Sequence, residues 1–257
     1  MVKIMMNERE SLGLVLKTSD YQENAALINL LTPSGKLNLI VRGAKKINSK
    51  TRAFAIPLTL LQFEHTNNRE LNTLTKCEVL DYYSSIKENP KLMFVAYAIL
   101  EKINLIPMAD QDDELFYQFV VDTLNLLKNT QYPDSLLAIF ELKLLYLLGV
   151  NPRFNQCPIC NKPVKDGCFS VEAAGVVCRD DCWNILTDLS FNHTKMMKYL
   201  YTIKLDKVDE NFLGLVSQFI PEIAEVIDRY YQRYLDFTSQ AKLIGQKMSA
   251  EPKSKML

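Results

Sequence analysis

The hydrophobic period of this chain changes near residue 85, and that change constrains the fold more than any other feature of the sequence. Before it, short apolar runs rich in Leu, Val and Ile alternate with turn-forming residues such as Thr32-Pro-Ser-Gly35. These runs cover residues 12–17, 26–31, 37–41, 58–63 and 71–79. About five short strands at this spacing predict a small closed barrel.

Two kinds of barrel fit this pattern. One is the oligonucleotide-binding (OB) fold, a five-stranded barrel that holds its ligand between loops. The other is an SH3-like barrel, whose strand pattern is almost the same.

After residue 85 the apolar residues recur at the spacing of helices. One amphipathic helix is predicted over residues 91–106, and a second begins near Asp112. The run 136–148 is apolar nearly all round, broken only by Glu141 and Lys143, which indicates a buried central helix. Further helices are expected over residues 195–203, 212–219 and 222–245, and the tail 247–257 is expected to fray.

The charges are balanced overall but unevenly distributed. The 257 residues contain 30 Lys and Arg and 30 Asp and Glu. Residues 1–80 hold 11 basic and 7 acidic residues, a balance of +4, and the remaining 177 hold 19 and 23, a balance of −4. The basic part of the chain is therefore N-terminal.

The basic residues of the barrel are concentrated in one stretch. No carboxylate occurs between Glu23 and Glu64, so the cations there have no counter-charge nearby in the sequence. Such a cluster attracts a polyanion without reading its sequence. We expect six side chains to contact phosphates: Lys36, Arg42, Lys45, Lys46, Lys50 and Arg52. Tyr21, Phe54 and Phe63 are candidates for base stacking, although each also suits the core.

Four cysteines form the strongest local motif. Cys157 and Cys160 are a C-x2-C pair, Cys178 and Cys182 are a C-x3-C pair, and 17 residues separate the pairs. This spacing is typical of a four-thiolate zinc ribbon or knuckle. Because four thiolates fill a tetrahedral coordination sphere, we expect one structural zinc ion and no catalytic metal. Cys168 is an alternative ligand, and a set of reduced, buried thiols is the simpler interpretation.

The sequence offers little for catalysis or membrane insertion. It has two His and no phosphate-binding glycine loop, nucleophile elbow or H-E-x-x-H motif, so we expect no enzyme. No run reaches the ~20 apolar residues of a membrane span, and charged residues occupy positions 8–10 where a secretory signal is apolar. We expect a soluble cytoplasmic protein without membrane contacts.

Several strings resemble the bacterial recombination mediator family RecO. The first runs from Leu27 through Thr32-Pro-Ser-Gly-Lys36 to Val41-Arg-Gly-Ala-Lys-Lys46. The second runs from Leu147-Leu-Gly-Val-Asn-Pro152 into the C-x2-C pair and on to Cys168-Phe-Ser-Val-Glu-Ala-Ala-Gly-Val-Val-Cys178. Ala174 stands where the family commonly has a glycine, and no counterpart of a late Lys-Ser-Arg motif is found in 241–248. The likeness extends over about residues 11–240.

The resemblance implies a non-enzymatic factor of DNA repair and homologous recombination in bacteria. Such a factor binds single- and double-stranded DNA, anneals complementary strands, and works with RecR and with single-strand-binding protein so that RecA is loaded. It implies association with the nucleoid when active. The acidic, apolar-ended tail of single-strand-binding protein is expected to bind the helical domain, where apolar grooves are bordered by Lys or Arg.

Together these features predict an α+β multidomain protein. Residues 1–82 are expected to form an OB-fold barrel that binds nucleic acid, 83–150 and 184–246 an all-α helical domain, 151–183 a zinc-ribbon-like insertion with four Cys, and 247–257 a flexible tail. Two rival functions remain. One is a zinc-stabilised adaptor whose barrel binds proteins rather than DNA, and the other is a metal-dependent nuclease.

Overall fold

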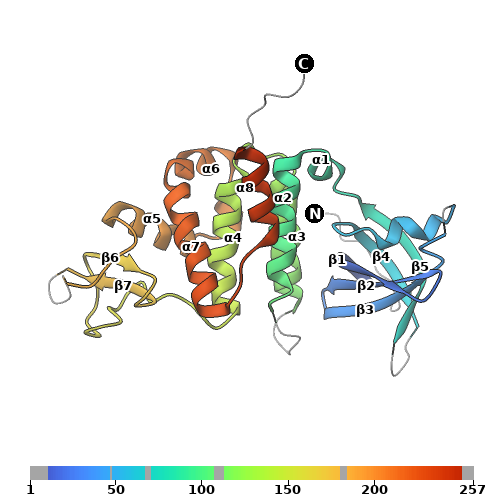
Figure 1. Ribbon diagram of the computed structural model, residues 1–257, viewed down its shortest axis with the longest axis horizontal. Coiled ribbons are helices and arrows are strands. Elements are labelled where there is room, and N and C mark those ends of the chain that lie inside the picture. Colours follow the sequence, from blue (N-terminus) through green and yellow to red (C-terminus); the bar gives the residue numbers. More distant parts are fainter. Residues whose placement is uncertain (1–10, 47, 67–70, 107–112, 180–183, 251–257) are drawn as a thin grey trace, which may run out of the picture. The chain divides into compact units, whose positions relative to one another are not determined.

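The computed structural model describes residues 11–46, 48–66, 71–106, 113–179 and 184–250 (Figure 1). The chain divides into two compact units. Unit 1 comprises residues 1–100 and 107–128, and unit 2 comprises residues 101–106 and 129–257. No helix of the described part is long and apolar enough to span a bilayer.

Unit 1 contains a closed barrel of five strands in the order β1-β2-β3-β5-β4. The strands are β1 (Ser11–Tyr21), β2 (Ala25–Thr32), β3 (Gly35–Arg42), β4 (Leu60–His65) and β5 (Asn72–Asp81). All neighbours pair antiparallel except β3 and β5, which are parallel. This connectivity is that of an OB-fold, so the five-stranded barrel expected from the sequence is confirmed and the SH3-like alternative is excluded.

The barrel closes around side chains that alternate along its strands. Ile28 and Leu30 on β2, Leu39 and Val41 on β3, and Phe63 on β4 fill the core. A side chain at position 13 of β1 would place its Cβ 2.9 Å from the ring of Phe63, so Gly13 leaves room for that ring.

Three helices complete unit 1 or join it to unit 2. They are α1 (Ser84–Lys87), α2 (Pro90–Ile103), which passes from one unit to the other after Leu100, and α3 (Asp113–Leu127). Helix α3 packs on β2 and β3. Residues of β2 are buried on both faces of that strand because the core lies on one side and α3 covers the other.

Unit 2 is built around α4 (Pro133–Leu147). Eleven of its residues are buried, and it packs against α5 (Phe191–Thr202), α6 (Glu210–Val216) and α7 (Ile220–Leu235). The expected buried central helix is therefore confirmed. Pro133 occupies the first turn of α4, where a missing N–H costs nothing, and Gly149 after its end has a positive φ of 71°.

The single long helix expected over residues 222–245 is wrong. Helix α7 ends at Leu235, Asp236 adopts the left-handed conformation with φ 49°, and a separate helix α8 (Gln240–Ala250) follows. The turn is held because Phe237 donates its backbone N–H to the carbonyl of Tyr231. The apolar spacing continues through the break, so periodicity could not reveal it. Residues 247–250 belong to α8, where the sequence suggested that a flexible tail begins.

Glu101 fixes the start of α8. Its carboxylate accepts a hydrogen bond from the Ser239 hydroxyl at 2.5 Å and another from the backbone N–H of Ala241 at 3.0 Å. An acidic group at this position satisfies helix N–H groups that have no partner within the helix.

A buried ionic network joins four helices of unit 2. The carboxylate of Glu141 on α4 is fully buried and lies 2.7 Å from Nζ of Lys102 and of Lys242. Lys242 also donates to Asp228 at 2.6 Å. The ammonium of Lys102 is 1% exposed and also lies 5.3 Å from the ring centre of Tyr231. Two lysines thus balance two carboxylates, of which Glu141 is shielded from water and Asp228 lies at the exposed edge of the network.

Candidate nucleic-acid interface and metal centre

The basic segment, residues 42–52, follows strand β3 and lies on the barrel. Gly43 begins it with φ +74°, and a 3-10 helix η1 (Lys50–Ala55) ends it. Thr51 donates its hydroxyl hydrogen to the carbonyl of Arg42 at 3.0 Å, which ties the two ends of the segment together. A side chain of the segment therefore helps to hold the shape of the loop.

Five of the six cations expected to contact phosphates lie in this basic segment, and all five are exposed: Arg42, Lys45, Lys46, Lys50 and Arg52. The sixth, Lys36, is half-buried at the other end of β3. At ~3.3 Å per residue, six residues of strand separate it from Arg42 by about 20 Å. Burial lowers the pKa of Lys36. Lys36 is thus set apart from the other five.

Lys45 has a counter-charge after all. Its Nζ lies 3.0 Å from Asp20 at the end of β1. The stretch 24–63 contains no carboxylate. The antiparallel pairing of β1 with β2 brings Asp20 opposite Ala26, and Lys45 donates its backbone N–H to the carbonyl of Asn24. The expectation that all six cations lack a counter-charge is therefore wrong for Lys45.

Replacing Asp20 with Asn should strengthen the binding of single-stranded DNA by two- to threefold, because it releases Lys45 from an exposed pair worth about 0.5 kcal/mol. Fluorescence anisotropy at low salt measures this. Glu78→Gln, at an exposed acidic residue of β5, is the matched control and should leave affinity unchanged. Equal effects of the two substitutions would show that only net charge matters.

The three aromatic candidates for base stacking belong to the barrel wall. Phe63 is 2% exposed in the core, and Phe54 packs against that core. Tyr21 is half-buried at the end of β1. The core reading therefore fits Phe63 and Phe54 better than a stacking role.

The cysteine motif lies in a small module of unit 2 that carries a hairpin of β6 (Gly167–Ser170) and β7 (Gly175–Cys178). A tight turn presents the first pair: Asn161 has φ 59°, and its N–H donates to the carbonyl of Cys157 at 2.9 Å. Gly175 is required because a Cβ there would lie 2.5 Å from the carbonyl oxygen of Arg153. Ala174, at the position where a glycine was expected, has a positive φ of 56°.

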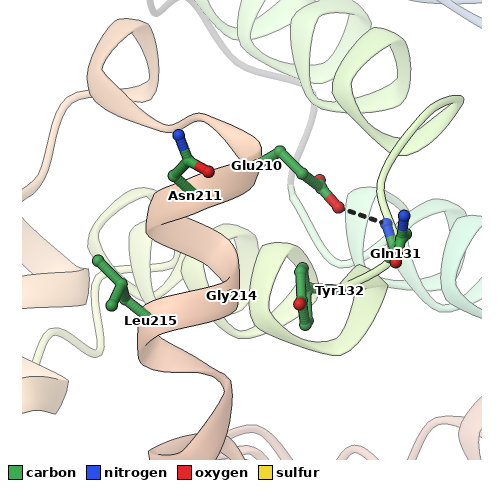
Figure 2. A pocket seen from close by; sticks show the side chains of 6 residues that line it. All are labelled: Gln131, Tyr132, Glu210, Asn211, Gly214 and Leu215. Atoms are coloured by element: carbon green, nitrogen blue, oxygen red, sulfur yellow. Dashed lines mark hydrogen bonds between the residues drawn. The ribbon is translucent and has the colours of Figure 1, made fainter.

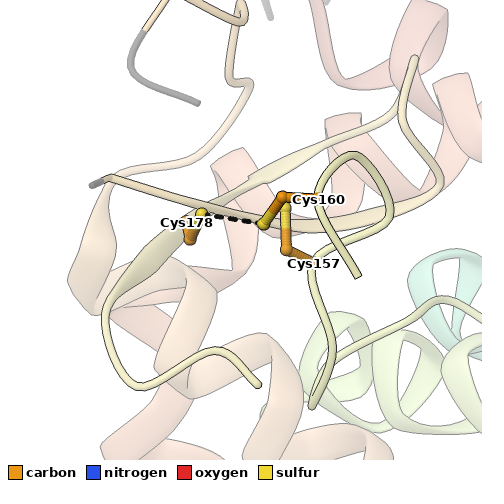
Figure 3. A group of neighbouring side chains, drawn as sticks. All are labelled: Cys157, Cys160 and Cys178. Atoms are coloured by element: carbon orange, nitrogen blue, oxygen red, sulfur yellow. Dashed lines mark hydrogen bonds between the residues drawn. The ribbon is translucent and has the colours of Figure 1, made fainter. Parts of the chain in front are cut away.

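Figure 3 shows the sulfur atoms of Cys157, Cys160 and Cys178 pointing toward one another. All three lie within 4.8 Å of each other, and the sulfurs of Cys160 and Cys178 are 3.5 Å apart. Zn–S bonds of about 2.3 Å at tetrahedral angles separate sulfurs by about 3.8 Å, so the donor set fits a metal ion. The fourth expected ligand, Cys182, lies outside the described residues.

Cys157 is poised to act as a thiolate. Burial alone raises the pKa of its thiol, but hydrogen bonds from the backbone of Cys160, Cys178 and Ile159, and from the Cys160 side chain, outweigh it and lower the pKa to about 6. Backbone donors directed at a sulfur favour its charged form, which is the form that binds metal.

The other described cysteines stand apart from this cluster. Cys168 on β6 accepts a weak contact from Arg179 at 3.9 Å and is not one of the three clustered sulfurs. Cys77 packs against the barrel core, and burial raises its pKa to about 12. Cys77 is therefore a half-buried apolar side chain packed on the barrel core.

A shallow pocket of about 450 Å³ lies between α6 and the start of α4 (Figure 2). Glu210 accepts a hydrogen bond from the backbone N–H of Gln131 at 2.9 Å across it. The ring of Tyr132 lies against Gly214, where a Cβ would be 3.0 Å from the ring. Sequence reasoning did not find this pocket, since its residues come from segments about 80 positions apart.

Family models and individual relatives both match this chain over nearly its whole length, and all of them belong to one family. The family model described as recombination protein O N terminal matches residues 6–83, and the one described as recombination protein O C terminal matches residues 88–242. The DNA repair protein RecO of Exiguobacterium sibiricum is 30% identical, over 90% of this chain and 94% of its own length. The proteins of the same name from Bacillus pumilus and Bacillus subtilis are 26% identical, over 95% and 93% of this chain and 96% and 94% of their own lengths.

Proposed function

Because this chain belongs to the recombination protein O family, we propose that it is a non-catalytic factor of DNA repair and recombination that binds DNA and anneals complementary strands. The observation that carries the proposal is the basic segment: five exposed cations on a hydrogen-bonded loop of an OB-type barrel. Phosphate backbones are the ligands such a surface attracts.

Annealing follows from holding backbones rather than bases. Lysine and arginine side chains that contact phosphates leave the Watson–Crick edges of a strand free to pair. The positions of Phe63 in the core and of Phe54 against it support this mode, because neither ring is placed to cover the bases. Four exposed cations of the segment have no carboxylate partner among the described residues and are the most available for such contacts: Arg42, Lys46, Lys50 and Arg52.

The cysteine module would hold one structural zinc ion through Cys157, Cys160, Cys178 and, from the sequence, Cys182. The ion would supply folding energy to a module too small to fold on its own core. Four thiolates leave no position for water, so the module stabilises the fold and takes no part in a reaction.

The family also supports the partners and the domain limits. We propose that the protein works with RecR and with the C-terminal tail of single-strand-binding protein, and reaches RecA indirectly through them. The proposed domains are the OB barrel at 1–82, the helical domain at 83–150 and 184–246, and the zinc module at 151–183.

The test is annealing of complementary oligonucleotides coated with single-strand-binding protein. Wild type should accelerate annealing, and a variant with Lys45→Glu, Lys46→Glu, Lys50→Glu and Arg52→Glu should lose the acceleration. If the five clustered cations engage single strands, log affinity should fall with log salt at a slope of about −3.5, since each contact adds ~0.7. Six engaged cations would give about −4.

Two double variants with the same change in net charge distinguish an effect of the basic segment from an effect of net charge alone. Lys46→Glu with Arg52→Glu removes two cations of the basic segment, whereas Lys17→Glu with Lys76→Glu removes two exposed cations elsewhere on the barrel. The first pair should weaken binding much more than the second. Unchanged DNA affinity in the quadruple variant, with normal zinc content and melting temperature, would refute the site and favour an adaptor that binds proteins.

A further inference from the structure

Unit 2 contains two stretches of sequence without carboxylates, although its basic and acidic residues are equal in number overall. Residues 142–165 contain four Lys or Arg and no Asp or Glu, and residues 189–205 contain three Lys and no Asp or Glu. This is the same signal that marks the stretch 24–63 in the barrel. The net charge of unit 2 does not reveal these two stretches, because its acidic residues lie elsewhere in the sequence.

The fold brings these two stretches together. Helices α4 and α5 pack against each other. Lys143 of α4 donates to the carbonyl of Tyr201 on α5 at 3.3 Å, and the rings of Phe154 and Tyr201 are 5.1 Å apart. Tyr146, one turn after Lys143, is close enough to Tyr201 for its charge to raise the pKa of that phenol, a second cause after burial.

We name the α4–α5 surface by five residues: Lys143, Tyr146, Lys198, Tyr201 and Lys204. Lys198 and Tyr201 share one face of α5, since they are three residues apart. Within the described part of the chain, no carboxylate pairs with Lys143, Lys198 or Lys204. Lys143 is engaged with the Tyr201 carbonyl, so the charges of exposed Lys204 and half-buried Lys198 are the ones open to an external anion.

The surface also carries an exposed aromatic ring. Tyr146 is 67% exposed, the largest value for any aromatic side chain among the described residues. A ring beside cations is the combination that single-stranded nucleic acid uses: phosphates contact the cations, and a base stacks on the ring.

We propose that the α4–α5 surface is a second binding site for single-stranded nucleic acid. The inference rests on the proposed function and deepens it: the barrel holds one strand and unit 2 holds the other. Strand annealing needs two strands on one protein, and a single phosphate-binding loop supplies only one. The barrel candidates Phe54 and Phe63 pack in or against its core, whereas the α4–α5 surface offers the exposed ring of Tyr146, so the two sites hold their strands differently.

The side chains to replace follow from the contacts. Lys143 caps the carbonyl end of α5, so it is left intact. Lys198→Glu with Lys204→Glu removes the two remaining cations, and Tyr146→Ala removes the ring. Lys207→Glu with Lys247→Glu is the matched control: Lys207 is flanked by Asp206 and Asp209, and Lys247 lies on α8.

The experiment measures energy transfer between two non-complementary oligonucleotides carrying donor and acceptor dyes. Wild type should bring the two strands into one complex. The Lys198→Glu, Lys204→Glu variant and the quadruple barrel variant should each still bind one strand but fail to bridge two, and the control should bridge normally. The salt slope of the Lys198→Glu, Lys204→Glu variant should be shallower by about 1.4, at ~0.7 for each lost contact.

Tyr146 is tested in the quadruple barrel variant, where only the second site remains. Tyr146→Ala should weaken binding there by about tenfold, within the range for loss of one stacked base, and Tyr146→Phe should restore it. If wild type neither binds nor anneals DNA, the proposed function fails. If wild type anneals and bridges while the α4–α5 variants match their control, only the second site is refuted, and its ring and cations then serve a protein partner.

Discussion

Replacing Glu141 with Gln should lower the free energy of unfolding of unit 2 by about 3–5 kcal/mol. The substitution removes the charge that Lys102 and Lys242 share at 2.7 Å each. Lys102 would then keep a charge in a site that is 1% exposed, with only aromatic faces to replace the carboxylate. At 2–4 °C per kcal/mol, the melting temperature should fall by roughly 6–20 °C.

Two variants make this result specific. Asp228→Asn changes a carboxylate at the exposed edge of the same network and should cost under about 1 kcal/mol, since that side chain is 41% exposed. Lys102→Met with Glu141→Leu removes the buried pair and leaves Lys242 with Asp228, so it should recover most of the loss. Calorimetry measures all three. A Glu141→Gln protein within 1 kcal/mol of wild type would contradict the network's role.

The ion pairs of Glu141 with Lys102 and Lys242 also make the stability of unit 2 depend on pH in the acidic range. Burial alone raises the pKa of Glu141, but the charges of Lys102 and Lys242 outweigh it and hold the pKa below the usual value of 4.5. A lowered pKa in the folded state contributes stability above 4.5, and that stability is lost as the pH falls through the folded value. Glu141→Gln should lack this part of the acid dependence.

Replacing Cys157 with Ser should abolish zinc binding and unfold the module around it. Structural zinc contributes on the order of 10 kcal/mol to the folding of such modules, because the ligands come together only in the folded state. Metal analysis of purified protein should find about one equivalent in wild type and none in the variant. Removal of zinc from wild type by a chelator should have the same effect.

Cys168→Ser is the control, since Cys168 lies outside the sulfur cluster. It should keep its zinc. Zinc retained by Cys157→Ser, or lost by Cys168→Ser, would mean that the ligand set is wrong. DNA binding through the basic segment should survive Cys157→Ser, because the barrel and the cysteine module belong to different units.

Local sequence patterns predicted most elements, because each depends on neighbours a few residues away. All five strands and the buried helix α4 follow from alternation or from continuous apolar runs. The break at Asp236 does not, since the apolar spacing of α7 carries on into α8 and the turn depends on backbone contacts. The spacing of apolar residues predicts which face of a helix is buried, but it does not predict where the backbone turns.

For the candidate sites too, the sequence predicted the features that are local in the chain and missed those that depend on contacts across the fold. The basic segment and the cysteine pairs are local, and the structure gathers five of the six cations and three of the four thiols. The pairing of Lys45 with Asp20 and the partners of Glu141 depend on contacts made across the fold. Glu141 did stand out as a charge inside an apolar helix, but the sequence could not name which lysines, 39 residues before and 101 after, neutralise it.

The position of Lys242 orders the folding of unit 2 in time. Every residue of unit 1 has been synthesised once Lys128 is made, so its barrel can close while the rest of the chain is still on the ribosome. Glu141 is synthesised soon afterwards, but Lys242 is synthesised only 101 residues later. At ~5–20 residues per second that interval is about 5–20 s, during which a core carboxylate has only Lys102 beside it. Unit 2 therefore reaches its final packing only after helix α8 has left the ribosome, whereas the barrel of unit 1 is complete long before.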